Sequence, residues 1–173
     1  MKRFIGAIFI LGLLFNTTTS FAQNKELKFG HVNFQEIMSM MPERDSAQQE
    51  LQEYNQMLQR EMQNMQNEYT QKLQKYTDNQ DSYSDLVRKS KERELQEMQR
   101  RIQEFQSNAQ QDFQRKQSEV LQPIMQKIEK AVKRVGEKHG FIYIFDTSAG
   151  GVLYKSEQSK NVLPMVKKEL GIQ

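Results

Sequence analysis

"LQEYNQMLQREMQNMQNEYTQKLQKY", residues 51–76, contains neither glycine nor proline, and glutamine is its commonest residue. Its apolar residues recur at steps of 3-4-4-3-4-4-3, the spacing of one helix face. This 11-residue period predicts a nearly straight helix pair rather than a heptad coiled coil. A helix with so few apolar residues cannot form one wall of an ordinary core, so it predicts a thin seam. The stripe consists of Leu51, Tyr54, Leu58, Met62, Met65, Tyr69, Leu73 and Tyr76.

A second thin stripe lies further along the chain, at Leu95, Met98, Ile102, Phe105, Ala109 and Phe113. Between the stripes lies "TDNQDSYSD", residues 77–85, a cluster of turn-forming residues. Two stripes on either side of one turn predict an antiparallel helical hairpin that closes along one seam. With the turn centred on Gln80, Pro42 and Pro123 fall at the foot of the hairpin. Each arm is then about 57 Å long.

The two chain ends predict a small body rich in β-strands. "LKFGHVNF" (27–34) predicts a strand, and "FIYIFD" (141–146), apolar on both faces, predicts a buried one. "TSAGG" predicts a turn that makes "VLYK" (152–155) a hairpin partner of that strand. "NVLPMVKKELG" predicts a short last helix, which Asn161 caps and Gly171 ends.

A wide apolar face distinguishes residues 120–135 from the thin stripes before them, as a core-facing helix requires. Gly140 suits the left-handed cap that would end this helix. The predicted core of the body, which would also hold copies of the chain together, consists of Phe29, Val32, Ile124, Ile128, Val132, Val135, Ile142, Ile144, Val152 and Tyr154.

The predicted fold class is therefore α+β and mostly α. A helical hairpin of residues 43–118 is inserted into a body made of residues 23–42 and 119–173. Three short strands and a few helical turns make a small core for one chain. We therefore expect several copies to assemble through the body, with their strands joined between subunits.

The first residues, 1–22, have the layout of a cleavable secretory signal peptide. Lys2 and Arg3 precede an apolar run from Phe4 to Phe15, and Ser20-Phe21-Ala22 matches a cleavage site. The run is shorter than the roughly 20 residues that a membrane-spanning helix needs. We expect export, with cleavage after Ala22, and no permanent anchor.

The composition excludes several classes of function. Without Lys2 and Arg3 the chain has 23 basic and 22 acidic residues, and no basic cluster resembles a nucleic-acid footprint. Zero cysteines exclude a disulfide scaffold. His31 and His139 lie far apart in sequence, so they predict neither a metal site nor a catalytic pair. We predict no catalytic residue and no cofactor, and hence a protein that is not an enzyme.

The candidates for partner contact are apolar residues of the arms. Met57, Tyr83 and Leu86 lie outside the stripes and are free to bind. Met62, Met65 and Met98 belong to the stripes, where packing competes with binding. "RKSKER" (88–93), near the turn, is either a solvated helix surface or a weak anion contact.

Both chain ends resemble the Skp/OmpH family of periplasmic chaperones. The matching features are "KFGHVNFQEIM", "AVKRVGEKHGFIYIFD" and the "VLY" before a terminal helix. The resemblance implies a homotrimer whose hairpins surround a cavity, in which unfolded outer-membrane proteins are held soluble in the periplasm. The family's best-known arms are strongly basic, whereas residues 43–118 contain 12 basic and 14 acidic residues. Contact with membrane or lipopolysaccharide is therefore left open.

A second hypothesis is a structural one. A coiled-coil spacer or adaptor of the envelope, which docks one defined partner through the hairpin tip, would have the same composition. The two hypotheses differ in an assay: a chaperone protects several unrelated unfolded proteins from aggregation, and a spacer protects none.

Overall fold

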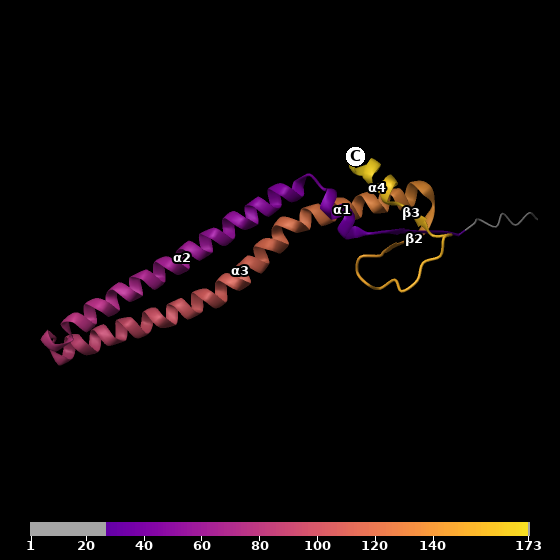
Figure 1. Ribbon diagram of the computed structural model, residues 1–173. Coiled ribbons are helices and arrows are strands. Elements are labelled where there is room, and N and C mark those ends of the chain that lie inside the picture. The colour runs from indigo at the N-terminus through magenta and orange to yellow at the C-terminus, as the bar shows by residue number, and fades with distance from the viewer. Residues whose placement is uncertain (1–26, 173) are drawn as a thin grey trace, which may run out of the picture.

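A computed structural model describes residues 27–172, so the predicted signal peptide lies outside the described residues. The fold is α+β and mostly α, with a long hairpin at one end and a small body at the other (Figure 1). No helix among residues 27–172 is long and apolar enough to cross a membrane. The elements are β1 Lys28–Val32, α1 Phe34–Met40, α2 Glu43–Asn79, the 3-10 helix η1 Gln80–Ser82, α3 Asp85–His139, β2 Phe141–Asp146, β3 Lys160–Asn161 and α4 Leu163–Leu170.

The hairpin consists of α2 and the first part of α3, and it confirms the architecture that the stripes predict (Figure 1). With 37 residues, α2 is about 55 Å long. Its end, at Asn79, lies inside the predicted turn cluster, and η1 and Ser84 complete the turn. The Ser84 hydroxyl accepts a hydrogen bond from the Val87 N–H, which caps the start of α3.

The predicted register of the hairpin, centred on Gln80, is wrong. Across the seam, Tyr76 donates a hydrogen bond to Glu92, and Lys72 forms a salt bridge with Glu94. At the foot Lys127 pairs with Glu43. These pairs place the centre several residues after Gln80, because α2 ends only at Asn79 and the turn extends to Ser84. Consequently Pro42 lies opposite the region of Pro123, and not opposite residue 118.

Helix α3 runs without interruption from the turn into the body, although it contains Pro123. Proline removes one backbone hydrogen bond and clashes with the preceding turn, which bends a helix. Figure 1 shows α3 bending between the hairpin and the body. Gly140, with φ 68°, ends the helix in the left-handed conformation that its sequence predicts.

The sheet is parallel, with the strand order β2-β1-β3. The prediction that "VLYK" forms a hairpin strand with β2 is wrong for the single chain. Residues 152–155 lie in a loop, residues 147–159, that carries the chain back to start β3 parallel to β1. Because β3 pairs with β1 on the side away from β2, the chain crosses the sheet after β2 instead of turning back beside it. Asn161 lies in β3, and its side chain still accepts a hydrogen bond from the Leu163 N–H at the start of α4.

The core lies where α1, the second half of α3 and α4 meet one face of the sheet. Four predicted core residues are buried, namely Val32, Ile124, Ile128 and Val135. Three are half-buried, namely Val132, Ile144 and Val152, and three are exposed, namely Phe29, Ile142 and Tyr154. Further buried residues are Ile37, Met41, Ala131, Val162 and Val166. Val162 and Val166 are four residues apart, so they lie on one face of a helix, and this spacing could have predicted that both are buried.

Replacing Gly30 with alanine is expected to destabilise the body by about 1–3 kcal/mol. A Cβ at Gly30 would lie 2.9 Å from Val162 Cγ1 and 3.2 Å from Ile144 Cγ1, inside the packed core. Gly136→Ala is the matched control, since its Cβ would make an ordinary 3.5 Å contact with Ile144 Cδ1. This second change is expected to stabilise α3 by up to about 1 kcal/mol. Urea unfolding measures both, and equal effects of the two variants would contradict the packing at Gly30.

Candidate functional site

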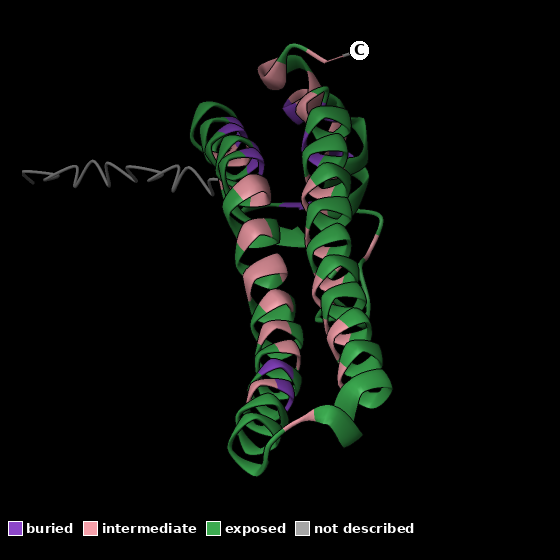
Figure 2. Cartoon of the chain, turned by 90° about the vertical axis from the view of Figure 1, so that its left-hand side faces the viewer, coloured by how far each residue is buried: buried purple, intermediate pink, exposed green. Residues whose placement is uncertain are grey.

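The hairpin surface is mostly polar, because its apolar residues turn toward the seam. Figure 2 shows the half-buried and buried residues along the facing sides of the two helices, with exposed residues outside. Leu95 and Met98 of α3 are the buried seam residues near the turn, and most of the remaining stripe is half-buried. The seam therefore stabilises the hairpin but leaves little continuous apolar surface on its outside.

Charged and polar side chains cross the seam at its margins. Hydrogen bonds from Lys72 and Lys91 lower the pKa of Glu94, so this carboxylate stays ionised beside two ammonium groups. The Tyr76 hydroxyl donates to Glu92 Oε1 over 2.7 Å, and this bond raises the pKa of Tyr76. Exposed pairs of this kind contribute little stability. Their clearer role is to fix the register of the two helices.

The six candidate contact residues divide into two groups. Met62 and Met65 are half-buried in the seam and Met98 is buried there, so packing uses most of their surface. Met57 and Leu86 are 46% and 81% exposed. Tyr83 is intermediate, because its ring lies against Tyr76 with 6.3 Å between the ring centroids.

Other apolar side chains of the hairpin are also exposed, and sequence reasoning did not select them. Val87 lies beside Leu86 at the start of α3, and Leu73 is exposed although it belongs to the first stripe. Met40 and Met125 are exposed near the foot of the hairpin. Val87 directly follows Leu86 outside both stripes, and this position is the signal that could have identified it.

The body has an exposed apolar face on the side of the sheet away from α3. The rings of Phe29 and Tyr143 are nearly parallel, with centroids 6.4 Å apart, and Phe145 stacks on Tyr143 at 5.8 Å. Tyr143 is 60% exposed. We call Phe29, Tyr143 and Phe145 the aromatic row. An exposed apolar surface of this kind marks an interaction site.

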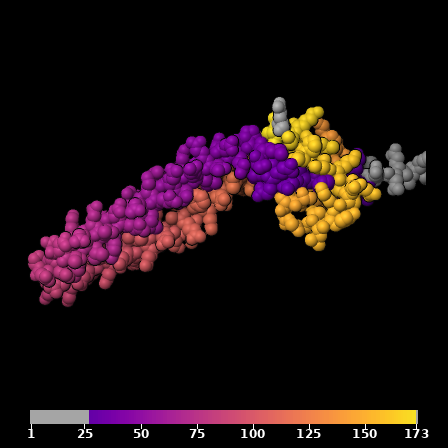
Figure 3. Space-filling view, viewed as in Figure 1, coloured from indigo at the N-terminus to yellow at the C-terminus, as the bar shows by residue number. Residues whose placement is uncertain are grey.

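The 147–159 loop adds to this exposed surface. In it, Leu153 is 98% exposed and Tyr154 is 82% exposed. Figure 3 shows the loop as a lobe beside the strands of the body. Two large apolar side chains held in water are costly for one isolated chain, and exposed apolar surface of this kind is typical of interaction sites.

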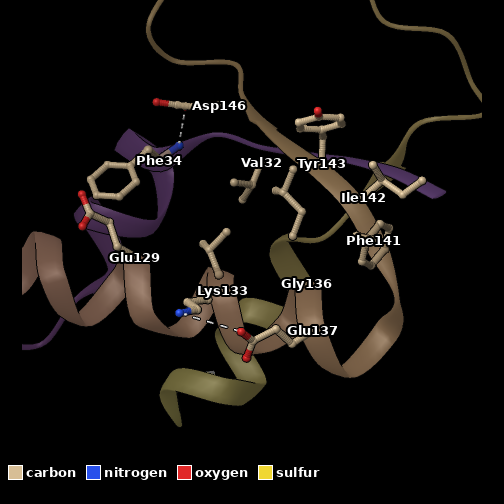
Figure 4. A pocket seen from close by; sticks show the side chains of 12 residues that line it. Val32, Phe34, Glu129, Lys133, Gly136, Glu137, Phe141, Ile142, Tyr143 and Asp146 are labelled. Carbon is tan, nitrogen blue, oxygen red and sulfur yellow. Dashed lines mark hydrogen bonds and ion pairs between the residues drawn. The ribbon is translucent and has the colours of Figure 1, made fainter. Parts of the chain in front are cut away.

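A shallow groove runs along β2, with a volume of about 420 Å³. Figure 4 shows it between β2 and the end of α3, with Val32, Phe34 and Phe141 among its lining side chains. At its rim Asp146 accepts hydrogen bonds from the Phe34 N–H at 3.1 Å and the Ser148 N–H at 2.8 Å. Because β2 is an edge strand of the sheet, one row of its backbone groups has no strand partner within residues 27–172.

The histidines lie in different surroundings. His31 is buried in β1 between the sheet and the loop, and His139 is exposed at the end of α3. Within residues 27–172, no group of three or more histidine or carboxylate side chains is placed to bind a metal ion.

The comparison with known families decides what this architecture belongs to. The family model described as "Outer membrane protein (OmpH-like)" matches residues 28–170. The chain belongs to the OmpH-like family. That family consists of periplasmic chaperones of outer-membrane proteins, and not of enzymes. No sequence among the curated proteins matches the chain.

Membership in the OmpH-like family concerns the hairpin and the body together. It supports a periplasmic chaperone whose partners are outer-membrane proteins. The match spans β1 to α4 and therefore includes both the hairpin and the body.

Proposed function

We propose that this OmpH-like protein is an ATP-independent holdase that keeps unfolded outer-membrane proteins soluble in a cavity between the hairpins of a homotrimer. Residues 43–118 would provide the wall of the cavity, and residues 23–42 and 119–173 would assemble the three chains. Residues 1–22 would direct export to the periplasm and be cleaved. The observation that carries the proposal is the hairpin surface, which is polar and glutamine-rich with isolated apolar side chains.

This surface suits weak binding to many sequences. Met57 and Leu86 offer separate apolar contacts, and methionine adapts its shape to different partners. Glutamine side chains can both donate and accept hydrogen bonds, so they can bind the backbone of an unfolded chain. Each contact is weak and short-lived, but many together in a confined space hold a client firmly. Because no contact is strong, release needs no nucleotide.

The exposed surface of the body supports the assembly. The aromatic row, together with Leu153 and Tyr154, forms an apolar surface that nothing within residues 27–172 covers. The outer strand β2 also offers backbone groups for pairing. In a homotrimer, each of these surfaces would meet the next copy. Mass measurement in solution tests this part: we expect about three chains, and a stable folded monomer at micromolar concentration would contradict it.

The decisive test is suppression of aggregation. Several unrelated outer-membrane β-barrel proteins, unfolded in urea, are diluted with and without the protein, and light scattering is recorded. A holdase suppresses the scattering of all of them without ATP. A structural spacer or adaptor, the second candidate function, suppresses none, and that result would reject the proposal.

Client capture is expected to depend only mildly on salt. Residues 43–118 contain 12 basic and 14 acidic residues, so the arms are nearly neutral, and exposed charges are screened over about 10 Å at 0.1 M salt. The holdase assay at 20 mM and 200 mM sodium chloride measures this dependence, with mild meaning less than about a twofold change. A steep loss of protection at the higher concentration would show instead that cation clusters such as residues 88–93 bind the client.

A further inference from the structure

His31 joins the middle strand of the sheet to the 147–159 loop. It lies in β1, is 8% exposed, and is a polar residue among the buried ones. Its Nδ1 lies 2.9 Å from Ser159 Oγ, and its Nε2 lies 2.8 Å from Lys155 Nζ. Both partners belong to the same loop, so one imidazole fixes the returning part of the loop to the sheet.

The two contacts define the protonation state of the ring. The Lys155 ammonium has only donors, so Nε2 of His31 must accept and can carry no proton. Nδ1 then carries the single ring proton and donates it to the Ser159 hydroxyl. The contact as it stands therefore requires a neutral imidazole.

The surroundings of His31 disfavour a second positive charge. The ring lines a hollow of about 720 Å³ between the sheet and the loop, whose charged lining residues are Lys28 of β1, Lys155 and Glu157 of the loop, and Lys160 of β3. From β2, Phe145 lines the hollow, and the carboxylate of Asp146 is already held by Ser148 and Phe34. Burial first, and then the charge of Lys155, lower the pKa of His31.

We propose that the His31–Lys155 contact is a proton-sensitive latch, which holds the 147–159 loop on the sheet when the imidazole is neutral and releases it when the imidazole is protonated. Protonation places an N–H at Nε2, so two positively charged donors face each other. Both ends of the loop stay attached, through Thr147 N–H to Val32 O at 2.9 Å and Val162 N–H to His31 O at 3.0 Å. Release is therefore confined to the residues between, which include Leu153 and Tyr154.

The direction of the pH dependence follows from the two states of the ring. In the closed loop the pKa of His31 is lowered, and in the open loop it returns toward the ordinary value of 6.5. Closure is thus fully favoured above pH 6.5 and is lost as the pH falls from there through the lowered pKa. Between the two pKa values, each fall of one pH unit raises the ratio of open to closed loop by up to about tenfold.

Hydrogen exchange of the full mature chain between pH 8 and pH 5 tests the latch without any client. Exchange rates are divided by those of an unstructured peptide at the same pH, which gives the protection of each segment. We expect the protection of residues 156–159, whose turn is closed by the Ser159 N–H to Ser156 O bond of 3.1 Å, to fall below pH 6.5 while that of β1 and β2 stays constant. Unchanged protection of the loop across this range would overturn the proposal.

Two variants and one control assign the effect to His31. Glutamine at this position keeps an acceptor and a donor but does not titrate, so His31→Gln should give a loop whose protection no longer depends on pH. Lys155→Met changes an exposed loop residue and serves if the first variant fails to fold: it should weaken protection at pH 8 and reduce the pH dependence, of which the part caused by burial of the ring remains. His139→Gln replaces the other histidine and should change nothing. A pH dependence that survives in His31→Gln, or one that is unchanged in Lys155→Met, would assign it to another group and reject the latch.

Discussion

A chain whose arms are shortened by deleting Gln59–Asn108 is expected to fold and assemble but to lose its protection of unfolded outer-membrane proteins. Leu58 is joined to Ala109 by a short glycine-rich turn, because these two residues line the same hollow across the seam. The buried residues of the body, including Ile128 and Val135, are untouched. Circular dichroism and mass in solution measure folding and assembly, and light scattering of diluted client should return almost to the level without chaperone.

The control for this deletion keeps the full length and replaces Met57, Tyr83 and Leu86 with serine. It removes two exposed apolar side chains and the half-buried Tyr83 but leaves the rest of the hairpin, so capture should weaken only partly, on the order of tenfold in affinity. If the shortened chain protects clients as well as the full chain does, the hairpin is not the client-binding element. Deletion of residues 59–98, as the register centred on Gln80 would suggest, would join positions that do not face each other.

Tyr143→Asp is expected to separate the assembled chains without unfolding them. Tyr143 is 60% exposed in one chain, so the change costs the single chain little. In an assembly that covers the aromatic row, an unpaired carboxylate would be buried at a cost of several kcal/mol. The dissociation constant should rise by more than about a hundredfold, since each 1.4 kcal/mol is a factor of ten. At micromolar concentration the mass should fall from about three chains to one.

The control for Tyr143→Asp is Leu86→Asp at the hairpin tip. Leu86 is 81% exposed and lies at the opposite end of the molecule, so the same new charge should leave the assembly intact. Circular dichroism of both variants checks that the helices persist. If Tyr143→Asp remains assembled, the aromatic row is not the surface that joins the chains.

The hairpin could be predicted from sequence because its signals are local. The stripe from Leu51 to Tyr76 has a helical period, and turn-forming residues interrupt the chain once between the two stripes. The register could not be predicted equally well. Turn-forming residues show that a helix ends nearby but not at which residue, and α2 continues through Thr77, Asp78 and Asn79 before it stops.

The strand order of the body depends on contacts between residues far apart in sequence. Patterns within a short stretch of sequence do not predict which strands pair. "TSAGG" has the composition of a hairpin turn, but β1 pairs in parallel with both β2 and β3, so the chain must cross back through a loop. Ile142 and Tyr143 were expected to be buried because β2 is apolar on both faces, yet both are exposed in the single chain. The exposure of the candidates Met57 and Leu86 followed from their position outside the stripes, whereas the exposure of Leu73, a stripe residue, did not follow from the sequence pattern.

The continuity of α3 from tip to core makes the hairpin a lever. The helix reaches the tip at Asp85 and the core at Ile124 and Ile128, and it bends between them (Figure 1). For an arm of about 55 Å, a rotation of about 10° at this bend carries the tip through about 10 Å. In the proposed trimer, the opening between neighbouring arms would therefore be set by small angles at the foot, while the seam of each hairpin stays closed. Such a trimer would admit clients of different sizes without separating the two helices of any hairpin.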